Sequence, residues 1–174
     1  IEIDEGHWDA LRKTARDFTD ILLGEDCLSY PPDKIFEYYP AQVTVDGITV
    51  DNVGVRKKGF FGSLDENKPS LKIKFSEYDQ DQRLHGMQRM TLNNNRQDPS
   101  QITSCLTYSV FRAAGYPAPR CNFAHVTVNG KELGVYSHVE SVKKAYLRRH
   151  FDDGEGNLYE GTLSDFHPEW KGSF

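Results

Sequence analysis

The segment from Val53 to Phe75, VGVRKKGFFGSLDENKPSLKIKF, places two strand-like runs on either side of a turn that contains glycine and cationic side chains. In the second run, SLKIKF (70–75), apolar residues alternate with Lys72 and Lys74. This period of two is typical of a strand with one buried face. The pattern therefore predicts a sheet in which the two lysines point away from the core.

The same segment carries a possible anion site. Gly59 and Gly62 lie in the turn, where glycine lets backbone N–H groups approach an anion closely. Arg56 and Lys58 share a face of the preceding strand, and such cations can hold phosphate oxygens. One interpretation is a phosphate-binding hairpin at the edge of a sheet. The alternative is an ordinary solvated basic hairpin.

Composition narrows the class of protein. The chain has 174 residues, of which 37% are hydrophobic and 27% are charged, values that suit a globular protein. The net charge of −5 argues against a general binder of nucleic acid or of membrane surfaces. No apolar run approaches the ~20 residues that a membrane span needs, and the first residues lack the pattern of a secretory signal.

Metal and cysteine patterns give little guidance. The histidines do not follow the spacing of a zinc site, and DDGEGN (152–157) does not match a calcium loop. The P-loop pattern is also missing from the sequence. The three cysteines, Cys27, Cys105 and Cys121, permit one disulfide with one free thiol, or no disulfide.

Periodicity and turn residues predict an α+β fold, a mostly antiparallel sheet with flanking helices. Asp46-Gly47 and Asn129-Gly130 are strong hairpin signals between strand-like runs. The predicted elements are an amphipathic helix over 5–23, a loop over 25–40, strands over 41–45, 48–56, 70–75, 87–92, 121–128 and 133–140, and helices over 98–114 and 141–150.

Helix 98–114 has clear start and stop signals. Asp98 is placed to cap it, Pro99 suits the first helical position, and Gly115 can end it. Its apolar residues fall on one helical face, namely Ile102, Leu106, Val110 and Ala114.

Two polar groups outside the hairpin are candidates for a structural or a functional role. Asn93, Asn94 and Asn95 form a run that is typical of turns, through side-chain to backbone hydrogen bonds. Glu140 follows the second hairpin and precedes the last helix, where an acid complements the helix dipole. The functional alternative places Glu140 at the mouth of a cleft.

Several motifs together resemble the spore-coat protein H (CotH) kinase family. They occur in the family's order and cover nearly the whole chain from about residue 36. The motifs are YYPAQVTVDG (38–47), NVGVRKKGFFGS (52–63), KPSLKIKF (68–75), MTLNNNRQDPS (90–100), FRAAGYPAPR (111–120), VTVNGKELGVYSHVE (126–140) and GNLYEG (156–161).

The resemblance implies an atypical protein kinase that binds ATP with Mg or Mn and phosphorylates serines of coat or surface proteins. The sheet would be the N-lobe and helix 98–114 its αC helix. Residues 36–174 would form this N-lobe, after an N-terminal helix and loop over 1–35. The resemblance also implies a monomer at a spore or cell surface, or outside the cell. Its implied nucleotide-binding residues are Arg56, Lys58, Gly59, Gly62, Ser63, Lys72, Lys74 and Glu140.

The sequence departs from the family pattern in two respects. Thr103 stands where members usually carry an arginine, and the helix contains no Asp or Glu that could pair with a lysine. The aspartates that the family uses for catalysis and metal binding lie downstream of the GNLYEG-like segment, so none is assigned here. We therefore expect the N-terminal part of a CotH-like kinase. The alternative is a non-catalytic extracellular surface or adhesion module that reuses the fold.

Overall fold

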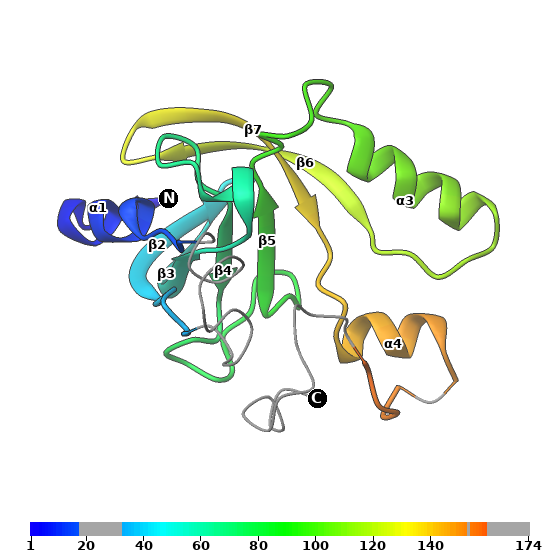
Figure 1. Ribbon diagram of the computed structural model, residues 1–174. Coiled ribbons are helices and arrows are strands. Elements are labelled where there is room, and N and C mark those ends of the chain that lie inside the picture. Colours follow the sequence, from blue (N-terminus) through cyan, green and yellow to red (C-terminus); the bar gives the residue numbers. More distant parts are fainter. Residues whose placement is uncertain (18–32, 153, 160–174) are drawn as a thin grey trace.

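An antiparallel sheet of seven strands forms the centre of the molecule (Figure 1). The computed structural model describes residues 1–17, 33–152 and 154–159. Helices flank the sheet, so the predicted α+β class is confirmed. The elements are β1 (Glu2–Ile3), α1 (Glu5–Lys13), β2 (Tyr39–Val45), β3 (Ile48–Lys57), the 3-10 helix η1 (Phe61–Leu64), β4 (Leu71–Lys74), β5 (Arg89–Asn93), α3 (Thr103–Ala113), β6 (Cys121–Val128), β7 (Lys131–Val139) and α4 (Lys144–His150).

The sheet curls so that its two ends meet. The strand order is β1-β2-β3-β4-β5-β7-β6. At the β6–β7 turn, the Asn129 side chain accepts a hydrogen bond from Ile3 N at 2.9 Å and donates one to Ile3 O at 2.8 Å. The backbone N–H of Asn129 also donates to the Ile1 carbonyl at 2.9 Å. One asparagine side chain thus serves as the hydrogen-bonding partner that β1 would otherwise lack at this edge.

The two predicted hairpin turns are confirmed. Asp46 and Gly47 have φ values of 49° and 83°, and Asn129 and Gly130 have values of 48° and 75°. Positive φ at both central residues is the geometry of a type I′ turn, which matches the twist of the flanking strands.

The core lies on the inner face of the curled sheet. Leu71, Ile73 and Phe75 are at most 1% exposed, so the predicted inward face of β4 is confirmed. Trp8 and Leu11 of α1 are buried against the same cluster. The outer face of the central strands is left for polar side chains.

Helix α1 is shorter than predicted. It ends at Lys13, and the prediction of helix through residues 14–17 was wrong; residues 18–23 of the predicted helix lie outside the described residues. Thr14 has ψ of 120°, and its hydroxyl donates to the Ala10 carbonyl at 2.7 Å. The buried Lys57 ammonium donates to the Arg12 carbonyl, which satisfies another carbonyl of the last turn. This tertiary cap is invisible in the helix's own sequence.

Helix α3 starts five residues later than Asp98, so the predicted start was wrong. Gln101 adopts φ of 61°, a left-handed conformation that a continuous helix does not contain. Asp98 still satisfies a backbone N–H at the start of the helix, because its carboxylate accepts from Thr103 N at 2.8 Å. Hydrogen bonds from Ser100 and Thr103 outweigh the effect of burial and lower the pKa of Asp98. Helix α4 likewise begins later than predicted, at Lys144, and its buried residue is Tyr146.

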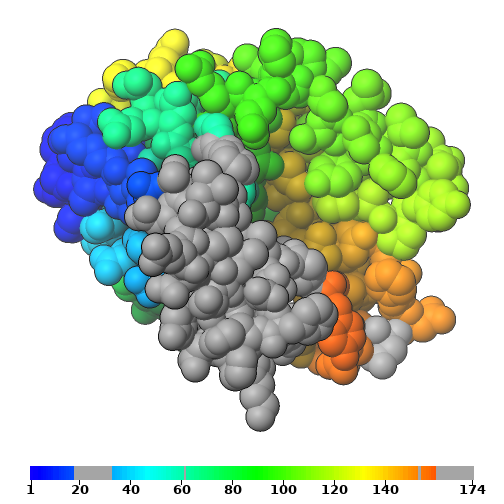
Figure 2. Space-filling model, in the orientation of Figure 1, coloured from blue at the N-terminus to red at the C-terminus, as the bar shows by residue number. Residues whose placement is uncertain are grey.

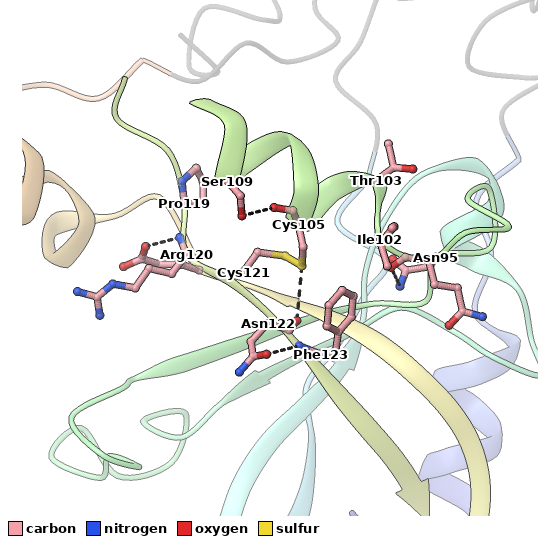
Figure 3. The surroundings of a disulfide bond; sticks show 12 residues. Asn95, Ile102, Thr103, Cys105, Ser109, Pro119, Arg120, Cys121, Asn122 and Phe123 are labelled. Atoms are coloured by element: carbon pink, nitrogen blue, oxygen red, sulfur yellow. Dashed lines mark hydrogen bonds between the residues drawn. A yellow bond between two sulfur atoms is a disulfide. The ribbon is translucent and has the colours of Figure 1, made fainter. Parts of the chain in front are cut away.

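A disulfide holds α3 against the sheet. Cys105 of α3 is bonded to Cys121 at the start of β6 (Figure 3). Of the two alternatives that the sequence left open, the structure therefore has the disulfide. Cys27 lies outside the described residues. Cys105 is the one buried residue of α3. The apolar stripe of Ile102, Leu106 and Val110 is 49–59% exposed, and α3 protrudes at the side of the molecule away from α1 (Figure 2).

Two predictions about the architecture remain open. The likeness to a kinase N-lobe and the domain boundary between residues 35 and 36 stay predictions. Among the helices that the structure describes, none combines the length and apolar character needed to cross a membrane.

Candidate functional site

The outer face of β3, β4 and β5 gathers five cations, which we call the cationic face. Arg56 lies opposite Lys72 in the β3–β4 ladder, and Lys74 lies opposite Arg89 in the β4–β5 ladder. The β3–β4 pairing extends by one bond, from Lys58 N to Ser70 O at 2.9 Å. Because side chains opposite each other in an antiparallel pair share a face, the ladders place these cations together. The members are Arg56, Lys58, Lys72, Lys74 and Arg89.

Lys58 is a desolvated member of the cationic face. Its ammonium donates to the Asn93 side-chain oxygen at 2.7 Å, a neutral acceptor. Burial, followed by repulsion from Lys72 and Arg56, lowers the pKa of Lys58. A half-buried ammonium with cationic neighbours and a neutral amide partner is an environment that an anion would stabilise.

Lys74 is engaged differently. Its ammonium forms an ion pair with Glu77 at 2.7 Å, and it lies 5.8 Å from the centre of the Tyr38 ring. The Arg56 guanidinium lies 5.3 Å from the same ring. Tyr38 therefore supports two cations of the face, a role that the sequence reasoning missed because the residue precedes the first predicted strand.

Lys57 does not belong to this face. The run Arg56-Lys57-Lys58 looks like one basic cluster in the sequence, yet Lys57 points to the opposite side of β3 and is 1% exposed. Burial lowers the pKa of Lys57, and Glu66 and Asp65 oppose that effect. Its contact with α1 makes it a structural residue.

The predicted phosphate loop follows Lys58 directly. Gly59 has φ of 116°, and a side chain there would meet Ser63 Cβ at 2.2 Å. A side chain at Gly62 would meet Gln97 Cγ at 2.9 Å. Gly59 is therefore required by its conformation, whereas Gly62 is in close contact with the Gln97 side chain. The loop ends in Ser70, whose amide donates to the Ser63 carbonyl at 2.9 Å.

Glu140, the last predicted site residue, is engaged in another contact. Its carboxylate forms a bidentate ion pair with Arg149 of α4 and accepts from Arg120 N at 2.9 Å. Burial raises the pKa of Glu140, but the bonds from Arg149 and Arg120 outweigh it, so that the pKa lies below its ordinary value. In this arrangement Glu140 anchors α4 to the end of β7; a role toward a nucleotide stays a prediction.

Substitution of Glu140 should weaken the fold in a pH-dependent way. Because the folded-state pKa is depressed, the stabilisation is complete above pH 4.5 and is lost as the pH falls through the folded pKa. We expect Glu140→Gln to lower the free energy of unfolding at pH 7 by about 1–2 kcal/mol and to flatten its decline in acid. Urea unfolding between pH 7 and 3 measures both. Glu132→Gln, at an exposed position, is the control; equal effects from both variants would contradict the role of the pair.

Candidate metal ligands are not grouped in this part of the chain. Within the described residues, no three His, Cys, Asp or Glu side chains lie together in a way that could hold a metal ion. The cationic face suits an anion and does not suit a bare cation. The residues of this face are therefore not assigned as ligands of a metal.

Comparison with known proteins gives the family. The model of the family described as CotH kinase protein matches residues 55–173. The inner spore coat protein H of Bacillus subtilis (strain 168) is 36% identical over 91 residues, which are 52% of this chain and 24% of that protein. An inner spore coat protein H-like protein of the same organism is 32% identical over 65 residues, 37% of this chain and 21% of that protein. The matches thus span about a quarter or less of these relatives. The family match covers more than half of the chain, and the chain belongs to the CotH kinase protein family.

Proposed function

We propose that this chain is the nucleotide-binding part of a CotH-like kinase and that its cationic face binds the phosphates of ATP. The observation that carries the proposal is the environment of Lys58. Its ammonium is half-buried, faces the neutral Asn93 amide, and has Lys72 and Arg56 near enough to lower its pKa. A triphosphate placed here would form charge-assisted hydrogen bonds and relieve the repulsion among the cations.

The chemistry expected from these residues is positioning and neutralisation. Lys58 and Lys72 would hold phosphate oxygens, and the backbone N–H groups of Gly59 and Gly62 would add donors. Charge that develops on the transferred phosphoryl group would be stabilised by the same cations. A divalent metal, which the resemblance to the family implies, would supply further positive charge to the phosphates, and none of the described residues is assigned to hold it. Phosphate transfer to serines of coat or surface proteins is proposed for the whole protein, with a location in the spore coat by analogy with the relatives' names.

Titration of the chain with ATP at low ionic strength tests this function. We expect saturable binding of ATP and of inorganic triphosphate by calorimetry, no binding of adenosine, and weaker binding as salt is added, because salt screens partly exposed charges. Adenosine is the matched control, since it keeps the base and sugar and lacks the phosphates. Absence of triphosphate binding would contradict the proposal.

A second function, a non-catalytic surface module, is favoured by one observation. Ile102, Leu106 and Val110 form an exposed apolar stripe on α3, and exposed apolar patches of this kind mark interaction surfaces. A chain that binds no polyphosphate but adheres to coat or cell-surface proteins through α3 would support this alternative.

A further inference from the structure

Asn94, the residue directly after β5, is bound to three points of the Gly59–Ser70 loop. The residue is 3% exposed. Its side-chain nitrogen donates to the Gly62 carbonyl at 3.0 Å and to the Lys68 carbonyl at 2.6 Å. Its backbone amide donates to the Ser70 hydroxyl at 3.0 Å. One buried side chain therefore connects the two arms of the loop.

Other contacts hold the loop that Asn94 binds in one conformation. The Asp65 carboxylate accepts from the backbone amides of Asn67 and Lys68, both at 2.8 Å. The Lys68 ammonium donates to the Val135 carbonyl of β7 at 2.9 Å. The loop is therefore folded on itself and fixed to the sheet at its distal end. Removal of the Asn94 side chain would leave the part-buried Gly62 and Lys68 carbonyls with fewer partners, which is costly.

The neighbouring asparagine links this arrangement to the cationic face. Asn93 accepts the bond from Lys58, the residue that enters the loop, while Asn94 holds the loop itself. The last residue of β5 and the residue after it thus determine the position of the ammonium and of the adjacent backbone. An anion bound by the Lys58 ammonium and by the adjacent loop backbone would meet groups that are already in place.

We infer that Asn94 is a positioning residue for anion binding: it holds the Gly59–Ser63 backbone beside Lys58, so that the loop is ordered before a polyphosphate arrives. The inference rests on the proposed function. A preordered site avoids the entropic cost of fixing a loop during binding. Loss of the Asn94 side chain should therefore weaken polyphosphate binding even though this side chain donates to the loop's own carbonyls.

The test compares Asn94→Ala with Asn129→Gly. The control removes an asparagine that also clamps backbone through its side chain, but at the β1 edge, and glycine keeps the positive φ of that turn. Two quantities are measured well below the melting temperature of each variant. One is hydrogen exchange of the loop amides over 59–68, and the other is the dissociation constant for inorganic triphosphate and for ATP.

We expect Asn94→Ala to speed loop exchange and to weaken triphosphate binding by about tenfold, whereas Asn129→Gly changes neither. Ser70→Ala removes the acceptor of the Asn94 backbone N–H. It should change the exchange rate and the dissociation constant in the same direction by less, and it replaces Asn94→Ala in the test if that variant does not fold. Faster loop exchange with unchanged affinity would overturn the inference and leave the proposed function intact. Failure of the unsubstituted chain to bind triphosphate would overturn the proposed function, and the positioning role with it.

Discussion

Removal of the Cys105–Cys121 disulfide is expected to cost about 3 kcal/mol of unfolding free energy, because the bridge closes a loop with a sequence separation of 16. For a chain of this size that corresponds to a drop in melting temperature on the order of 10 °C. The effect should be large because Cys105 is the one buried residue of α3. The measurement is thermal unfolding of Cys105→Ser/Cys121→Ser beside the unsubstituted chain, with and without reductant.

Cys27→Ser provides the matched control. It removes the third cysteine and leaves the bridge that the structure contains. The control should melt like the unsubstituted chain and should respond equally to reductant, whereas the double serine variant should not respond. A reductant response that disappears in Cys27→Ser would show that the pairing is wrong.

The turns and the strand faces were predictable because their signals are local. Asn129-Gly130 needs positive φ at both residues, which few other dipeptides accept, and the alternation in 70–75 fixes the inward face of β4. Strand β1 was not predicted, since two residues carry no periodicity. Its position depends on Asn129, more than 120 residues away along the chain.

Errors occurred where a distant contact determines a local feature. The end of α1 depends on Lys57. Strand parity puts this lysine on the core side of β3 with Val55, but nothing in the sequence indicates that it binds the Arg12 carbonyl of α1. The start of α3 depends on the left-handed conformation of Gln101. The stripe on α3 was correctly placed on one helical face, but the helix presents it to solvent and holds the sheet through Cys105.

The sequence predicted which cations gather at the site, but it did not predict the partner that each of them has in the fold. Strand parity predicted that Arg56 and Lys58 share a face of one strand and that Lys72 and Lys74 share a face of the next. The ladder that places Arg56 opposite Lys72 shows that the two pairs lie on the same face of the sheet. The partners that distinguish them are Asn93 for Lys58 and Glu77 for Lys74. The asparagine run was predicted to make hydrogen bonds from side chain to backbone within a turn, and Asn94 does bind backbone through its side chain. Its partners, however, lie in a loop more than 20 residues earlier, and no local sequence signal indicates that link.

Lys58→Met should weaken triphosphate binding by about tenfold to a hundredfold, the value of a charge-assisted hydrogen bond in a desolvated site. Lys74→Met is the matched control, with the same substitution on the same face. Lys74 is already paired with Glu77 at 2.7 Å, so an arriving anion would have to compete with a carboxylate for it. We therefore expect the control to change affinity by about twofold, the value of a partly exposed pair.

Stability should move in the opposite direction from affinity at Lys58. The folded state holds this ammonium at a lowered pKa because burial and cationic neighbours disfavour its charge, and methionine removes that cost. Urea unfolding of Lys58→Met should therefore give a free energy equal to or above that of the unsubstituted chain. Reduced affinity with undiminished stability is the signature of a residue retained for binding. If Lys58→Met instead binds triphosphate normally and unfolds more easily, Lys58 is a structural residue and the anion site has to be sought elsewhere on the cationic face.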